Sequence, residues 1–191
     1  MITPHQKIYV QLQPSASAIQ MLINTQAALT HQKTMRTVSS SKLHLTVLHI
    51  GLVQNLIDSI SQHTGSTPDF IIGQIDIFIT ELSAIMQPYE SKQFKLSTLE
   101  SANFGTKNTI LVIKFKPTTE LEELYASCLQ TTTKLLERCG ITSPISFMEH
   151  DRNLKYALSI KPHVTIAKSY TGARIKPPDT EMEFSLMPLL Y

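Results

Sequence analysis

The alternation of apolar and polar residues predicts a series of β-strands. Residues 6–13, QKIYVQLQ, alternate strictly around Ile8, Val10 and Leu12, so they form a half-buried strand that Pro14 ends. Similar patterns predict further strands at about 42–50, 70–86, 92–99, 109–116 and 157–168, and a last strand with the sequence EMEFSLMP.

Other segments carry apolar residues at helical spacing. One helix is capped by Ser15 or Ser17 and runs to about residue 30. A helix of about 20 residues opens at Thr118 or Thr119 and ends at Gly140. A short helix is predicted at about 54–63, and loops at 31–41, 142–156 and 171–179. Strands in adjacent groups with two main helices indicate an α+β fold with antiparallel sheets.

Length and composition describe an ordinary globular protein. The 191 residues predict a single domain over 1–191, which could consist of two tightly coupled lobes. Apolar residues make up 42% and charged residues 17%, which excludes a disordered or fibrous chain. The net charge of +2 argues against binding long duplex DNA, where a large basic excess is expected. Any site for an anion must therefore be local.

The targeting and cysteine patterns favour a cytoplasmic protein. No signal peptide is visible, and no apolar stretch approaches the roughly 20 residues that span a bilayer. Cys128 and Cys139 fall in one predicted helix, roughly 16 Å apart along its axis, too far for a disulfide. We therefore expect two buried thiols, a cytoplasmic location, no membrane partner and a monomer.

A short repeat is the most informative feature of the chain. Residues 42–47 read KLHLTV and residues 161–166 read KPHVTI, so both copies fit Lys-x-His-apolar-Thr-apolar on a predicted strand. At this composition a single copy of the His-apolar-Thr core, with apolar residues on both sides, is expected roughly 0.1 times by chance. Two copies with matched lysines therefore carry a strong signal.

Strand geometry predicts which way these residues face. Alternate residues of a strand share a face, so Lys42, His44 and Thr46 should lie opposite the apolar residues between them. The second copy presents Lys161, His163 and Thr165 in the same way. Two such strands side by side would place two histidines across a cleft.

The remaining polar residues add less. His49 lies an odd number of positions from His44, so it is expected to face away, which removes it from any zinc site. No other metal-ligand spacing is present, and no metal or other cofactor is expected. Tyr9 lies on the polar face of the opening strand and could stack against a nucleobase.

These residue types suit phosphoryl chemistry. Two imidazoles can share the work of general base and general acid, and two threonine hydroxyls can donate hydrogen bonds to a phosphate between them. We expect His44 and His163 to be catalytic and Thr46, Thr165, Lys42 and Lys161 to bind phosphate. Lysine charge and hydroxyl donors would stabilise the anionic transition state without a metal.

The two His-x-Thr motifs make the chain resemble the 2H phosphoesterase superfamily, in particular its 2'-5' RNA ligase or RNA 2',3'-cyclic phosphodiesterase group. The similarity covers the opening strand that ends at Pro14, HLTVLHIG, TILVIKFK and PHVTIAK. The resemblance implies a bilobal α+β fold, with two antiparallel sheets related by pseudo-twofold symmetry around a central cleft and helices outside. It also implies His44 as acid and His163 as base.

The expected function is therefore a metal-independent phosphodiesterase acting on 2',3'-cyclic phosphates or 2'-5' linkages in RNA ends or small nucleotides. Two alternatives stay open. The same chemistry could degrade cyclic or 2'-5' oligonucleotide signalling molecules. The same cleft could also bind a nucleotide phosphate without catalysis. The sequence does not separate a 2' from a 3' product, or show whether ligase activity exists.

Overall fold

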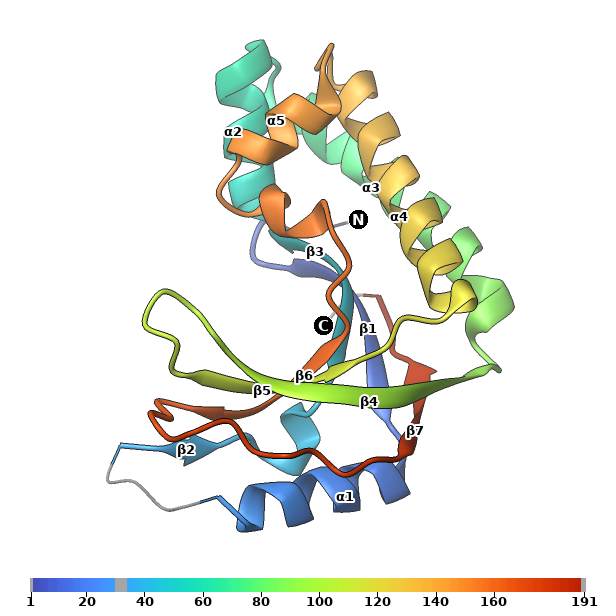
Figure 1. The fold of residues 1–191 in the computed structure, drawn as a ribbon. Helices are drawn as coiled ribbons and strands as arrows, with labels where there is room; N and C mark the ends of the chain where they lie inside the picture. Colours follow the sequence, from blue (N-terminus) through green and yellow to red (C-terminus); the bar gives the residue numbers. More distant parts are fainter. Residues whose placement is uncertain (1, 30–33, 190–191) are drawn as a thin grey trace.

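The structure, a computed structural model, describes residues 2–29 and 34–189, and residues 30–33, where the first helix was expected to meet a loop, lie outside these ranges. The helices are α1 (Ala16–Ala27), α2 (Val53–Thr64), α3 (Pro68–Met86), α4 (Thr119–Arg138) and α5 (Pro144–His150), with short 3-10 turns η1 (Ser40–Lys42), η2 (Gln87–Tyr89) and η3 (Leu154–Ala157). The strands are β1 (Lys7–Pro14), β2 (Arg36–Thr37), β3 (Leu45–Leu52), β4 (Gln93–Phe104), β5 (Ile110–Phe115), β6 (His163–Lys168) and β7 (Glu181–Leu186). The predicted α+β class is confirmed (Figure 1).

The described strands form one seven-stranded antiparallel sheet, rather than the two sheets expected, in the order β2-β6-β3-β1-β7-β4-β5. β4 joins the two halves because its first part pairs with β7 and its second part with β5. β5 also pairs with β6, which closes six of the strands into a ring. β3 and β6, the two motif strands, meet at the single pair Leu45 and Val164.

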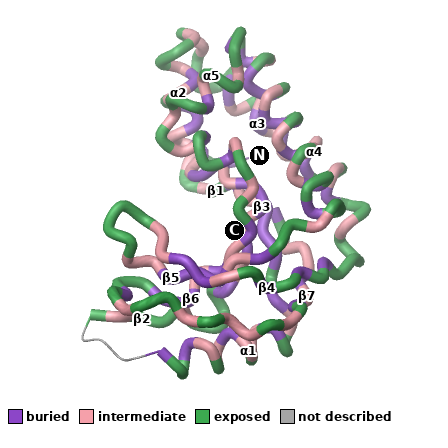
Figure 2. The backbone as a smooth tube through the Cα atoms, viewed as in Figure 1, coloured by how far each residue is buried: buried purple, intermediate pink, exposed green. Residues whose placement is uncertain are grey.

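The helices lie outside this sheet, as expected. α2, α3, α4 and α5 gather at one end of the molecule, and α1 lies at the opposite end (Figure 1). Buried residues follow the central strands and the inner faces of α3 and α4 (Figure 2). Fully buried aromatic residues of the core are Phe78, Phe94, Phe115 and Phe184.

The segment 70–86 is a helix, and the predicted strand there is wrong. Thr67 caps α3 by accepting a hydrogen bond from the Phe70 N–H, and Pro68 occupies the first helical turn. Its buried residues recur every three or four positions, at Ile71, Ile75, Phe78, Leu82 and Met86. Burial of this stripe against the core outweighs the strand preference of the many isoleucines.

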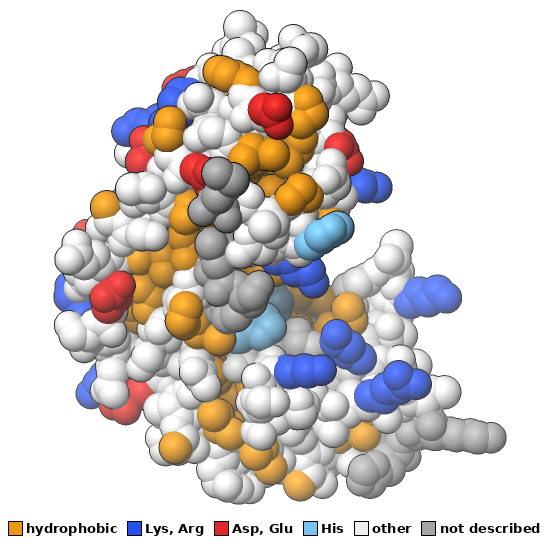
Figure 3. Space-filling model, turned by 180° about the vertical axis from the view of Figure 1, so that it is seen from behind, with side chains coloured by type: hydrophobic (Ala, Val, Ile, Leu, Met, Phe, Trp, Pro, Cys, Tyr) orange, Lys and Arg blue, Asp and Glu red, His pale blue; other side chains and the backbone are white. Residues whose placement is uncertain are grey.

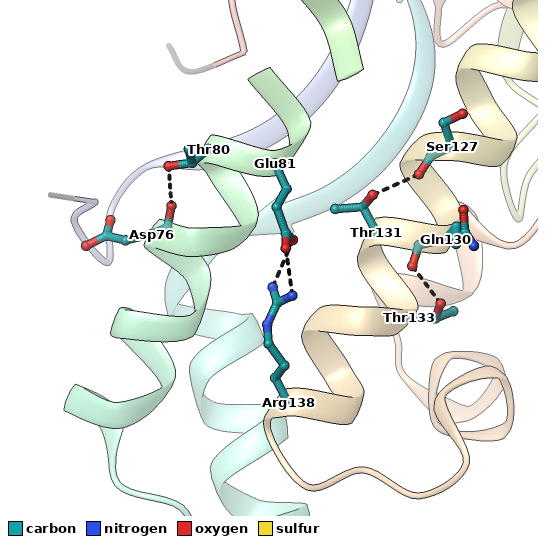
Figure 4. Close-up of polar contacts among 8 residues, drawn as sticks. All are labelled: Asp76, Thr80, Glu81, Ser127, Gln130, Thr131, Thr133 and Arg138. Carbon is teal, nitrogen blue, oxygen red and sulfur yellow. Dashed lines mark hydrogen bonds and ion pairs between the residues drawn. The ribbon is translucent and has the colours of Figure 1, made fainter. Parts of the chain in front are cut away.

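α3 packs beside α4, and a bidentate ion pair links the two helices (Figure 4). Arg138 donates from both terminal nitrogens to the Glu81 carboxylate, at 2.9 and 3.0 Å. The pair is partly exposed, so its contribution to stability is modest, at most about 1 kcal/mol. Apolar packing between α3 and α4 therefore contributes most of the stability of this layer.

Other boundaries also differ from the prediction: the predicted loop 31–41 contains the short strand β2, and β4 continues to Phe104 instead of ending at about residue 99. The predicted loop 142–156 contains α5 and the first three residues of η3, and the strand expected at 157–168 begins only at His163. The caps are confirmed at Ser15 and Thr118, whose side chains accept from backbone N–H groups of the first turn. No helix in the described part of the chain is long and apolar enough to cross a membrane.

Both cysteines are buried and free, as predicted. Burial raises the pKa of the Cys128 thiol to about 12. Burial also raises the pKa of Cys139, although the nearby Arg138 charge opposes that shift. Neither thiol is therefore ionised near neutral pH.

Candidate active site

The structure brings the two motif copies together. Leu45 and Val164 are paired across β3 and β6, and both side chains are fully buried in the core. In an antiparallel pair this register sets Thr46 opposite His163, and His44 opposite Thr165. All four polar side chains are half-buried and lie on the face opposite the core, as the two-residue period predicted.

The geometry of that face suits one small anion. His44 and His163 are diagonal neighbours across the two strands, a relation that places their Cβ atoms roughly 7–8 Å apart in a regular ladder. Side chains that start this far apart on one face can contact a tetrahedral phosphate from two sides. Figure 3 shows the surface hollowed between the helical end and the strands, with histidine, Lys and Arg side chains gathered around the hollow.

The two imidazoles are held by the same interaction. His44 Nδ1 is 2.9 Å from the carbonyl oxygen of Lys42, and His163 Nδ1 is 2.5 Å from the carbonyl oxygen of Lys161. A carbonyl oxygen only accepts hydrogen bonds, so Nδ1 is the protonated nitrogen in each neutral ring. The Nε2 atom of each histidine is consequently the one available to accept or deliver a proton.

His163 is biased toward its neutral form. Burial is the main cause that lowers its pKa, and the hydrogen bond to the Lys161 carbonyl opposes that shift. The charges of His44 and Lys161 lower the pKa further. The Phe104 ring packs against the His163 imidazole, with ring centroids 4.9 Å apart, and so contributes to this burial.

The two lysines do not lie in the strands, contrary to the prediction. Lys42 ends the 3-10 turn η1, and Lys161 lies two residues before the first residue of β6. Both side chains are exposed, and what each residue supplies to its histidine is a backbone carbonyl. A lysine is not required for that bond, since every residue carries a carbonyl group.

His49 lies on the same face as Thr46, and the expectation that it faces away is wrong. Thr46 pairs with Gln11 and His49 pairs with Tyr9, so β3 advances three residues where β1 advances two. The extra residue is a β-bulge at Val47, which reverses the alternation beyond it. Burial and the Lys7 charge lower the pKa of His49.

The bulge brings the His49 ring into contact with two tyrosine rings, those of Tyr9 and Tyr156, beside the histidine pair. The His49 ring contacts Tyr9 edge-on, with centroids 4.8 Å apart, and lies 5.9 Å from the ring of Tyr156. Tyr156 is 63% exposed and belongs to η3, a turn whose start is fixed by Asp151 accepting the Leu154 N–H. The sequence indicates Tyr9 as a residue that could stack on a nucleobase, but it does not indicate Tyr156. The local pattern around Tyr156 does not reveal that η3 packs on β3.

A charged pair also lies beside His163. Lys114 of β5 is the cross-strand partner of His163, and its ammonium forms an ion pair with Glu100 at 2.5 Å. The hydrogen bond and charge of Lys114 hold the pKa of the Glu100 carboxyl below its usual range. Because Glu100 is bound to Lys114, it adds little negative charge to the site.

A cavity of about 960 Å³ lies apart from these residues, between α2 and α5. Its lining includes Asp58, His63, Phe147 and Arg152, and none of the motif residues. The chemistry predicted from the sequence therefore belongs to the sheet face, not to this cavity.

Comparison with known proteins identifies the fold. No family model matches the chain, and no curated protein matches it. Among solved structures, TT0787 of Thermus thermophilus is 15% identical, with a TM-score of 0.57 over 97% of this chain and 82% of that one. E. coli LigT complexed with 3'-AMP is 18% identical, with a TM-score of 0.53 over 95% and 86%. A structure described as a phosphoesterase is 16% identical, with a TM-score of 0.55 over 95% and 86%.

Likeness at these identities concerns the fold. The match extends over nearly the whole chain, so the resemblance inferred from the two short motifs is confirmed at the level of fold. The roles of individual residues are argued from the site itself.

Proposed function

We propose that this protein is a metal-independent phosphodiesterase that hydrolyses 2',3'-cyclic phosphate or 2'-5' phosphodiester bonds in RNA ends or small nucleotides. The observation that carries the proposal is the convergence of two identical His–Thr units on one sheet face, each with its histidine held through Nδ1. E. coli LigT, which has the same fold, was crystallised with 3'-AMP and with ATP. These complexes support a nucleotide as the ligand.

The two histidines divide the proton transfers. His163 takes a proton from the attacking water through Nε2, a role that suits an imidazole whose lowered pKa keeps it neutral. The water oxygen forms the new bond to phosphorus as the bond to the 2' or 3' oxygen breaks. His44, on the opposite side of the phosphate, acts in its doubly protonated imidazolium form and donates the Nε2 proton to that leaving oxygen, while Nδ1–H stays bonded to the Lys42 carbonyl.

Hydroxyl and ammonium groups complete the site. Thr46 and Thr165 donate hydrogen bonds to the non-bridging phosphate oxygens, where negative charge concentrates in the transition state. Lys42 and Lys161 supply positive charge near the same oxygens. Tyr9 provides an aromatic surface for a nucleobase. It lies on β1, two residues from Gln11, which is the cross-strand partner of Thr46.

The test is hydrolysis of nucleoside 2',3'-cyclic phosphates in the presence of EDTA. We expect wild-type turnover, and a loss of roughly 10²–10⁴-fold in kcat for His44→Ala and for His163→Ala, because each removes one proton-transfer group. His63→Ala, in the separate cavity, is the matched control and should leave kcat unchanged. Near-wild-type kcat in either active-site variant would refute the assignment.

A substrate panel separates the alternatives. Cyclic mononucleotides, 2'-5' linked dinucleotides and cyclic dinucleotides should be compared by kcat/KM, with the position of the product phosphate determined by NMR. A strong preference for cyclic dinucleotides or 2'-5' oligonucleotides would favour a signalling substrate. Tight nucleotide binding without turnover of any compound would identify a binding protein instead.

A further inference from the structure

Two like charges lie side by side next to the proposed site. Arg36 of β2 is the direct cross-strand partner of Lys168 in β6, and both side chains are exposed. Like charges in such a pair destabilise a sheet. Within residues 2–29 and 34–189 neither cation forms an ion pair, so nothing described there offsets the repulsion. A bound anionic ligand would offset this repulsion.

Lys168 faces the site because β6 carries a bulge of its own. Thr165 pairs with Val112 and Lys168 pairs with Ile110, so β6 advances three residues where β5 advances two. Val112 and Ile110 are two apart and share a face, so Thr165 and Lys168 share it as well. The bulged residue is Ile166, which is fully buried.

A buried side chain fixes this arrangement. Gln26, only 8% exposed, donates from Nε2 to the carbonyl oxygens of Val38 and Ile166, at 2.8 and 2.9 Å. The Val38 N–H also donates to the Ile166 carbonyl, at 3.0 Å. Gln26 thereby ties the segment after β2 to the bulge of β6, which holds Arg36 beside Lys168.

The spacing between Thr165 and Lys168 is close to the spacing of neighbouring phosphates in a nucleic acid. Thr165 and Lys168 are separated by two residues of the partner strand, roughly 7 Å. Neighbouring phosphates along an extended nucleic acid strand have a similar spacing. Arg36 presents a planar set of donors that matches phosphate oxygens, and Lys168 adds a second charge.

We propose that Arg36 and Lys168 bind a second phosphate group of the substrate, one nucleotide away from the phosphate held between His44 and His163. This inference rests on the proposed function and narrows its substrate class. The substrate is a nucleotide that carries a further phosphate, such as a phosphorylated nucleotide or an RNA end, in preference to a nucleoside 2',3'-cyclic phosphate with a free 5'-hydroxyl.

The experiment measures binding and turnover separately. Calorimetry gives the Kd of adenosine 3'-monophosphate and of adenosine 3',5'-bisphosphate for wild type and for the Arg36→Met/Lys168→Met double variant. Wild type should prefer the bisphosphate on the order of tenfold at low salt, and the double variant should lose most of that preference. Lys134→Met, an exposed lysine on α4, is the matched charge control and should keep it.

Turnover distinguishes this inference from the proposed function. The ratio of kcat/KM for 2',3'-cyclic AMP with and without a 5'-phosphate should fall in the double variant by a similar factor. An equal ratio of Kd values in wild type and double variant would overturn the second phosphate site. Loss of the Kd preference in the double variant, with no turnover by wild type, would support the phosphate site and refute the phosphodiesterase.

Discussion

The Phe104 ring covers one side of the His163 imidazole, with centroids 4.9 Å apart. Because burial is the main cause of the lowered pKa of His163, replacing this ring by a smaller side chain admits water and favours the charged imidazolium. Phe104→Ala should therefore raise the pKa of His163. For a histidine that acts as base, the acidic limb of the kcat/KM profile should move to higher pH.

The measurement is the pH dependence of cyclic-nucleotide hydrolysis, with a histidine NMR titration of the same variant. Phe70→Ala, at an exposed position of α3, is the control and should leave the limb in place. An acidic limb that does not move in Phe104→Ala, while the His163 resonance does, would remove His163 from the role of base.

At the residue scale the sequence predicts which strand face carries the motif histidines, but not the face on which His49 lies. The two-residue period places His44 and His163 correctly, since both flank a core pair. It fails for His49, because a bulge at Val47 depends on how β3 pairs with β1. A bulge is a property of two strands, and a single strand's pattern does not reveal it.

At the element scale, α3 is the informative error. The segment contains many isoleucines, which favour strands, yet its Thr-Pro-Asp start is a typical helix N-terminus and its buried stripe has helical spacing. Length also argued for a helix, since 17 residues, 70–86, is far longer than most strands. In this segment, helix capping and burial of one helical face outweigh the intrinsic strand preference of isoleucine.

The helical assignment predicts different effects for neighbouring residues of α3. Phe78 is fully buried and Ile77 is 46% exposed, so Phe78→Ala should lower the free energy of unfolding by about 3–5 kcal/mol. Ile77→Ala should change it by about 0.5 kcal/mol or less. Urea unfolding followed by circular dichroism measures both. Similar losses for the two variants would contradict the burial of one helical face.

At the scale of the whole molecule, the sequence predicts the α+β class and the antiparallel pairing but not the closed arrangement of strands. β4 pairs with β7 along its first half and with β5 along its second, which merges the two expected sheets. Such a change of partner depends on long-range packing. The near-neutral net charge of +2 likewise hides the local pair of cations at Arg36 and Lys168.

The central claim is that His44 and His163 approach the same phosphate from opposite sides. The most direct measurement is an NMR titration of the histidine side-chain nitrogens with a nucleoside 3'-monophosphate. We predict that Nε2 of both histidines shifts with one shared Kd, and that His163→Ala weakens the response of His44. Shifts confined to one histidine, or two unrelated Kd values, would contradict the account.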